Sequence, residues 1–255
     1  PRLLRAAFGQ YYTNHTTFKH LAFLMWSHEN PYPVNFMGHR TMTRNDGGGL
    51  LGESLRTAIG IQFPHAVGAS AHFISWIWSY PVNDFLHTLA EYCREHSLDM
   101  NNNFAWICFF CLNQYDGWLN GCRSDGIQTF GSVVRHIRQV VSVVDDVASS
   151  AHHFKRLWPV FEVFTACAED IPVELALMEG AKRSLWRTPL GEALSAIVVD
   201  AQSARATYPA DEIRIQNWIV GNGGWGQINR TVKKKFAEEV RKIMSELVEI
   251  WAEGG

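Results

Sequence analysis

A single carboxylate, Glu162, lies within an otherwise apolar stretch at residues 157–164. Glutamate is almost never fully buried without a partner, so a lone Glu in such a stretch needs a reason. Two polar segments precede it, at residues 113–116 and 145–150, and each follows an apolar run of strand length. Because open α/β sheets bind ligands in the loops that follow strand ends, this pattern predicts a ligand site near these segments.

The elements that would position these residues are short apolar runs alternating with helical stretches. The apolar runs predict five strands, at residues 71–78, 104–111, 139–145, 173–178 and 195–199. The stretches between them predict helices at residues 82–97, about 130–138 and about 153–168. Strands of this length separated by helices are typical of an α/β fold, with a mainly parallel sheet covered by helices on both faces.

The two ends of the chain differ from this central region. Residues 1–70 are rich in Pro, Gly, Asn, Thr and His, which predicts a loop-rich arm with one short helix near 15–27. Residues 210–253 predict two helices, and the last, at 227–252, carries one long apolar stripe. We therefore expect an irregular arm (1–70), an α/β domain (71–200) and a C-terminal helical extension packed on that domain (201–255).

Composition excludes several classes of protein. Hydrophobic residues make up 47% of the chain, which is enough for a sizeable core, and the net charge is −2. Nucleic-acid binding usually needs a basic stripe, and the run 233–235 is more simply a solvated helix face, so we expect no nucleic-acid partner. No apolar run approaches roughly 18 residues, so we expect no transmembrane segment.

The start of the chain leaves its compartment open. The sequence begins at Pro1 rather than Met, so we expect a processed or excised product. A targeting segment would already have been removed from such a product. The expectation is an intracellular protein, cytoplasmic or organellar, for which peripheral association with a membrane complex remains an option.

Other motifs favour structural roles. The five cysteines are odd in number and irregular in spacing, and Cys108-x-x-Cys111 falls in a predicted strand, so we expect buried thiols rather than a disulfide framework, a redox pair or a zinc site. The glycines at 221, 223 and 226 match a dinucleotide fingerprint by letter, but a predicted helix precedes them, which favours a turn between helices. His152-His153 has no completing ligand at suitable spacing, so no metal site is expected.

A group of short motifs resembles the TIR (Toll/interleukin receptor) superfamily, and most of all heterokaryon-incompatibility (HET) and related algal domains. The first strand and the next one carry the pattern F-I-S-x-x-W followed by W-I-x-x-x-C-[IL]-N-Q. The later block is similar to a strand that ends in a Ser-rich turn before W-C-L-x-E-[LI]. The matching positions are Phe73-Ile74-Ser75, Trp78, Trp106-Ile107, Cys111-Leu112-Asn113-Gln114, Ala148-Ser149-Ser150 and Trp158-Pro159-Val160-Phe161-Glu162-Val163.

This resemblance implies a flavodoxin-like (TIR-like) fold and a specific chemistry. In catalytic TIR domains the matching Glu is needed to cleave the nicotinamide–ribose bond of NAD, so Glu162 is the candidate catalytic residue. Loss of nicotinamide leaves an oxocarbenium-like ribose, which a nearby carboxylate can stabilise. The candidate substrate-binding residues are Ser75, Trp78, Asn113, Asp116 and Trp158, and no cofactor is expected, since NAD would be the substrate.

Two departures from the family pattern keep alternatives open. Pro159 replaces the family cysteine. If a helix begins there, Glu162 lies in its first turn, where the positive end of the helix stabilises a carboxylate. Glu162 would then serve helix stability and not catalysis. Trp76-Ile77 replaces more polar residues after Ser75. Three functions therefore remain: an interaction or assembly module that binds a protein partner or itself, a non-catalytic subunit of a larger complex, and an NAD+ glycohydrolase.

Overall fold

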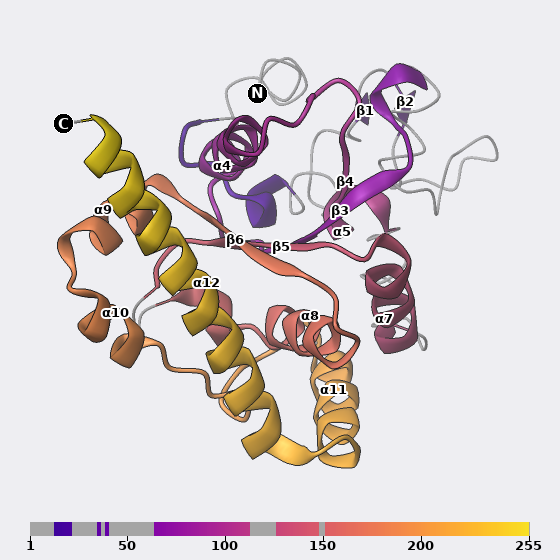
Figure 1. The fold of residues 1–255 in the computed structure, drawn as a ribbon. Helices are drawn as coiled ribbons and strands as arrows, with labels where there is room; N and C mark the ends of the chain where they lie inside the picture. The colour runs from indigo at the N-terminus through magenta and orange to yellow at the C-terminus, as the bar shows by residue number, and fades with distance from the viewer. Residues whose placement is uncertain are drawn as a thin grey trace. The chain divides into compact units, whose positions relative to one another are not determined.

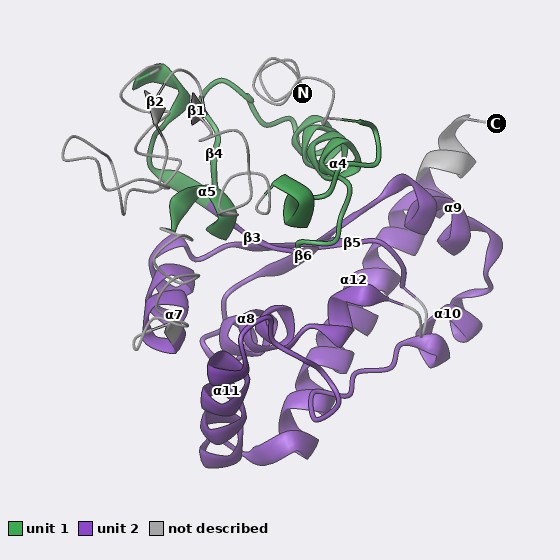
Figure 2. Cartoon of the chain, turned by 180° about the vertical axis from the view of Figure 1, so that it is seen from behind, with its two compact units in different colours: residues 1–71, 78–124 green, residues 72–77, 125–255 purple. Residues whose placement is uncertain are grey.

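The computed structural model describes residues 13–21, 35–36, 39–40, 64–112, 126–147 and 151–254. The chain divides into two compact units (Figure 2). One consists of Pro1–Ala71 and Trp78–Ser124, and the larger one of His72–Ile77 and Asp125–Gly255. Ser75, Trp158 and Glu162 belong to the larger unit, whereas Trp78 belongs to the smaller one.

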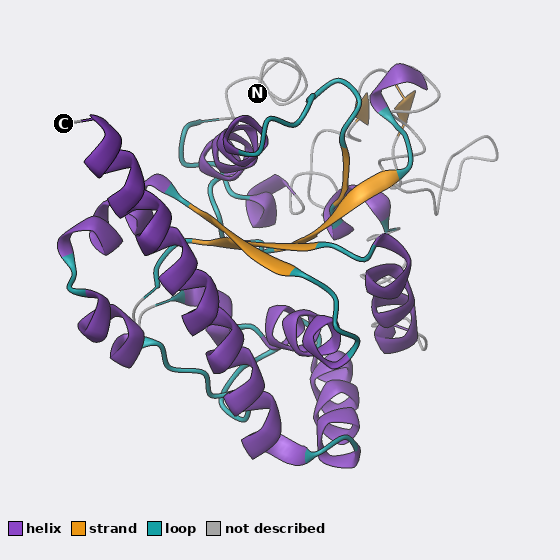
Figure 3. Cartoon of the chain, in the orientation of Figure 1, coloured by secondary structure: helices purple, strands orange, loops and turns teal. Residues whose placement is uncertain are grey.

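The fold is α/β, as the alternating pattern predicts. The main sheet of the described residues has four strands in the order β4-β3-β5-β6 (Figures 1 and 3). The strands are β3 (Ser70–Ser75), β4 (Phe104–Trp106), β5 (Val140–Val144) and β6 (Val173–Leu177). The helices are α4 (Val82–Glu95), α5 (Cys108–Cys111), α7 (Gly126–Ile137), α8 (Leu157–Ala168), α9 (Glu179–Arg187), α10 (Leu190–Ala196), α11 (Pro209–Gly221) and α12 (Gly224–Gly254).

Within the larger unit, β3, β5 and β6 run parallel. β3 pairs with β5 from Phe73 opposite Val140 to Ser75 opposite Ser142, and β5 pairs with β6 along its whole length. All five residues of β5 are buried, as expected for a parallel strand covered on both faces. The carboxyl ends of these strands therefore lie at one edge of the sheet, next to Ser75.

Three predicted strands differ from the structure, and the first of them, expected at 71–78, ends at Ser75. The fifth strand, expected at 195–199, is wrong: α10 ends at Ala196 and the following residues have no regular structure. Ile197 and Val199 are buried there, so these apolar side chains pack in the core although their backbone forms no strand. The strand expected at 104–111 ends at Trp106, because the chain turns into the one-turn helix α5 at Cys108.

Helix α8 is the buried helix of the larger unit. It follows a short 3-10 helix, η3 (His152–Lys155), and nine of its twelve residues are buried. Such a helix needs apolar residues all round, which accounts for the apolar stretch around Glu162. Pro159 lies in its first turn, where the missing N–H would have no helical partner, so the proline is tolerated.

The C-terminal helices α11 and α12 confirm the prediction for residues 210–253. Gly223 and Gly224 form the turn between them with φ angles of +104° and +74°, which favour glycine, so the glycine motif is a turn rather than a dinucleotide fingerprint. α12 contacts α8, α10, α11 and β6. The apolar stripe of α12 is fully buried in its first half, at Ile228, Val232, Phe236 and Val240.

The smaller unit has an aromatic centre formed by three segments. The Phe18 ring meets the rings of Phe85 and Phe109 edge to face, with centroids 5.1 Å away in both cases. Of the helix expected near 15–27, residues 18–21 are helical and residues 15–17 are not, and residues 22–27 lie outside the described residues. This unit also contains the 3-10 helix η2 (Pro64–Ala66) and a two-stranded antiparallel sheet of β1 (Asn35–Phe36) and β2 (His39–Arg40).

No helix in the described part of the chain is long and apolar enough to span a membrane. Cys93, Cys108, Cys111 and Cys167 are free thiols of intermediate exposure, so the expectation that the thiols are buried is wrong for these four. Cys122 lies outside the described residues.

Candidate functional site

The carboxyl group of Glu162 is held at the carboxyl end of β3. The Ser75 hydroxyl, on the last residue of β3, donates a 2.6 Å hydrogen bond to Oε2 of Glu162. Ser75 is completely buried and Glu162 is 5% exposed. The structure therefore joins two residues that the sequence motifs singled out separately, far apart in the chain.

Glu162 lies deeper in its helix than expected. Since α8 begins at Leu157 rather than at Pro159, Glu162 is in the second turn. The effect of the helix dipole on a carboxylate falls off within the first turn. The interpretation that Glu162 serves the helix end is therefore wrong, and its polar partner is the serine across the helix–sheet interface.

A loop from much later in the chain holds the start of α8. The Arg205 carbonyl accepts the N–H of Leu157 at 3.0 Å, and the Arg205 N–H donates to the Lys155 carbonyl at 3.0 Å. The first of these bonds satisfies an N–H group that a helix start would otherwise leave unpaired. The Arg156 guanidinium also donates to the Thr207 hydroxyl at 2.6 Å.

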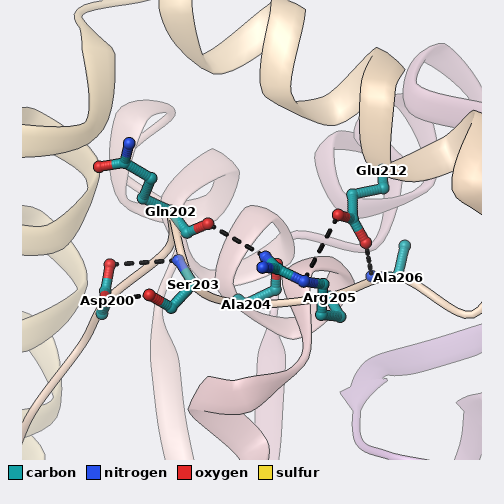
Figure 4. Close-up of polar contacts among 7 residues, drawn as sticks. All are labelled: Asp200, Gln202, Ser203, Ala204, Arg205, Ala206 and Glu212. Carbon is teal, nitrogen blue, oxygen red and sulfur yellow. Dashed lines mark hydrogen bonds and ion pairs between the residues drawn. The ribbon is translucent and has the colours of Figure 1, made fainter.

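The same loop is braced internally (Figure 4). The Glu212 carboxylate accepts the Ala206 N–H at 3.1 Å and lies 3.7 Å from Nε of Arg205. At the other end of the loop, the Ser203 hydroxyl donates to Asp200 at 2.5 Å. The segment that connects α10 to α11 thus holds the first turn of α8, the helix that carries Glu162.

Burial dominates the electrostatics of the site. It raises the pKa of Glu162 from 4.5 to about 8, because removal from water disfavours the charged form, and the Ser75 hydrogen bond acts in the opposite direction. At neutral pH the carboxyl is mostly neutral. A buried acid with a strongly perturbed pKa at the edge of a parallel sheet is a recognised mark of a functional site.

Further buried hydroxyls share the α8 side of the sheet. Ser142 lies opposite Ser75 in the parallel register, so both side chains point to the same face of the sheet. Thr165, three residues after Glu162, lies on the same face of α8. Neither the Ser142 nor the Thr165 hydroxyl has a hydrogen-bond partner among the described residues.

Trp158 is engaged within the protein. Its ring stacks on Phe130 of α7 with centroids 4.4 Å apart and an interplanar angle of 29°, and its Nε1 donates to Asp211 of α11 at 3.3 Å. The ring also meets Phe161 edge to face. Trp158 therefore fastens α8 to two neighbouring helices, and the structure does not bring it to Glu162 as a stacking surface.

The remaining predicted site residues are not joined to this pair. Trp78 meets Phe109 edge to face within the smaller unit. Asn113 and Asp116 lie outside the described residues, as does the turn at 148–150. Of the predicted site residues that the structure describes, it unites only Ser75 and Glu162.

A second polar pair was missed by the sequence reasoning. Nδ1 of His152 donates to Oδ2 of Asp145 at 2.5 Å, and Asp145 directly follows β5. The sequence reasoning considered His152 only as a metal ligand and did not predict this pair. The sequence feature that could have indicated the pair is an Asp at the end of a predicted strand, followed by a His seven residues later. Within the described residues no three His, Cys, Asp or Glu side chains come close enough to hold a metal ion.

His153 has a different environment from His152. It is completely buried beside Phe154 and Phe236, and burial lowers its pKa to about 3. The Val143 backbone acts on this pKa in the opposite direction, and neither ring nitrogen has a hydrogen-bond partner among the described residues. His153 is a neutral core residue and not a solvated histidine.

Comparison of the chain with the models of known protein families, with curated proteins and with solved structures finds no match.

Proposed function

We propose that the larger unit is part of a TIR-like, flavodoxin-like domain that cleaves the nicotinamide–ribose bond of NAD+, with Glu162 as the catalytic carboxyl. The observation that carries this proposal is the Ser75–Glu162 hydrogen bond at the carboxyl end of β3. Ligands of open α/β sheets bind at this edge. The resemblance to TIR domains independently assigns the same glutamate to this cleavage.

The chemistry requires the ionised form of Glu162. As nicotinamide leaves, positive charge develops on the ribose, and a carboxylate stabilises that charge where a neutral acid does not. With a pKa near 8 the free protein holds mostly the neutral acid at pH 7. A cationic nicotinamide ribosyl group beside the carboxyl would favour its ionised form, so substrate itself promotes the active state.

A second candidate is a non-catalytic assembly module, acting through a protein partner or self-association. It is favoured by the small exposure of Glu162 and by the engagement of Trp158 with Phe130 and Asp211, which leave little described surface for a substrate. In that case the Ser75–Glu162 bond is a buried structural contact between α8 and the sheet.

The decisive experiment is incubation of the purified protein with NAD+, with nicotinamide release measured by chromatography. The matched variants are Glu162→Gln and Glu169→Gln, which make the same chemical change at a buried and at an exposed position next to α8. Catalysis by Glu162 predicts nicotinamide from the wild type and from Glu169→Gln, and none from Glu162→Gln. Absence of nicotinamide from the wild type rejects the hydrolase and leaves the assembly module.

A further inference from the structure

The Asp145–His152 pair lies at the same edge of the sheet as the Ser75–Glu162 pair. β3 and β5 are neighbouring parallel strands, and Ser75 is opposite Ser142. Asp145 comes three residues later, one position beyond the end of β5. At roughly 3.3 Å per residue, Asp145 lies about 10 Å further in the strand direction than Ser75, beyond the carboxyl edge.

The geometry of the pair resembles that of an oriented base. The carboxylate of Asp145 is 20% exposed and accepts the Nδ1 N–H of His152, whose side chain is 62% exposed. A carboxylate on Nδ1 fixes the tautomer and the ring orientation, and leaves the lone pair of Nε2 on an accessible ring. The charged residues nearest to His152 along the chain are Asp146 before it and Lys155 after it.

We propose that His152 is the general base of the NAD+ hydrolysis and that Asp145 is its positioning residue; this inference rests on the proposed function. The oxygen of a water molecule forms a bond to C1′ of the ribose as the C1′–N1 bond breaks. The electron pair of that bond stays on N1, which neutralises the positive charge of nicotinamide. The proton of the water passes to Nε2 of His152 and then to solvent, while ionised Glu162 stabilises the ribosyl cation.

This division of labour makes the two pairs separable by experiment. Removal of a proton is needed when water is the acceptor but not when the acceptor is a neutral pyridine, which attacks C1′ through a lone pair and carries no proton to lose. Exchange of nicotinamide for 3-acetylpyridine therefore depends on Glu162 alone, whereas hydrolysis depends on both Glu162 and His152.

The test compares NAD+ hydrolysis and 3-acetylpyridine exchange in the full chain for the wild type, His152→Gln, Asp145→Asn and His136→Gln, an exposed histidine of α7. We expect His152→Gln to lower kcat for hydrolysis about 100-fold, the usual size of a general-base effect, with KM and exchange nearly unchanged. Asp145→Asn should lower hydrolysis less, and His136→Gln should change neither reaction.

The contrary outcomes separate the two proposals. If the wild type is active and His152→Gln either leaves hydrolysis unchanged or lowers both reactions equally, the base assignment is overturned and Glu162 catalysis stands. If the wild type neither hydrolyses nor exchanges, the proposed function falls and the base assignment falls with it. Circular dichroism of each variant checks that the fold is retained.

Discussion

Ser142 lies directly opposite Ser75 in the parallel pairing of β5 with β3, and of these two buried hydroxyls the structure gives a partner, within the residues it describes, to Ser75 alone. Both residues are fully buried serines on neighbouring parallel strands. They therefore form a natural matched pair for measuring what the hydrogen bond to Glu162 contributes to stability.

Ser75→Ala should destabilise the protein by about 1–3 kcal/mol, because it leaves the buried carboxyl of Glu162 without its donor. Ser142→Ala should be neutral or slightly stabilising, because it removes a buried hydroxyl that has no partner. Urea unfolding at pH 7 measures both. Equal losses at the two positions would show that the hydrogen bond adds nothing beyond strand packing.

The stability of the protein should fall as pH rises through the titration range of Glu162. Its pKa is about 8 in the folded chain and 4.5 in the unfolded one, so between these values the folded state keeps a proton that the unfolded state releases. The contribution is fully present below pH 4.5 and is lost as pH rises through 8, at up to about 1.4 kcal/mol per pH unit.

Unfolding measured from pH 6.5 to 8.5 tests this dependence. Glu162→Gln cannot ionise, so its stability should lack this slope over the same range. Glu169→Gln, at an exposed position, should keep the slope of the wild type. An identical slope in Glu162→Gln and the wild type would place the perturbed group elsewhere.

His153 should give the opposite dependence in acid. Its folded pKa of about 3 is lowered from 6.5, so the unfolded state gains a proton first as pH falls. The stability that follows from a neutral His153 is present above pH 6.5 and is lost as pH falls through 3, by a few kcal/mol in total.

His153→Leu should remove this acid-induced loss. Leucine keeps a similar volume in the pocket beside Phe154 and Phe236 and carries no group to protonate, so stability at pH 7 should be retained or increased. Glu162 contributes the same pH dependence to both proteins, so the difference between them reports on His153 alone. Unfolding at pH 3.5 and 4.5 that is as pH-dependent in His153→Leu as in the wild type would refute the assignment.

Phe236→Asp should destabilise the protein by several kcal/mol. Phe236 is completely buried and meets Phe154 edge to face at 4.5 Å, so the change both removes a core aromatic ring and buries a charge. Val248→Asp is the matched control on the same helix, since Val248 is 60% exposed and should cost less than about 0.5 kcal/mol. A melting temperature unchanged by Phe236→Asp would show that this face of α12 is not part of the core.

The regular elements of the larger unit were largely predictable because their patterns are unambiguous. The Val140–Val144 run is too short for a helix and rich in β-branched residues, and the stripe from Ile228 to Val240 repeats at helical spacing. Residues 195–199 have the same local appearance as a strand. Whether such a run pairs depends on a free neighbouring strand edge, which no local pattern records.

The candidate site was predictable only in part. Ser75 and Glu162 were recognised through motifs, but their hydrogen bond depends on the packing of α8 against β3, which involves residues distant in sequence. Trp158 was expected to bind substrate because it neighbours Glu162 in the motif. Its direction on the helix instead brings it to Phe130 and Asp211, a consequence of where α7 and α11 dock.

The hydrogen bonds between Arg205 and the start of α8 also bear on the order of assembly. During synthesis, β3, β5 and all of α8 leave the ribosome before Arg205, Thr207 and Glu212 do. The contacts that hold the start of α8 at the carboxyl edge of the sheet can therefore form only after the segment between α10 and α11 has emerged. A chain truncated after α10 would still contain all four residues of the two polar pairs: Ser75, Asp145, His152 and Glu162. It would lack Arg205 and Thr207, whose hydrogen bonds hold the first turn of α8.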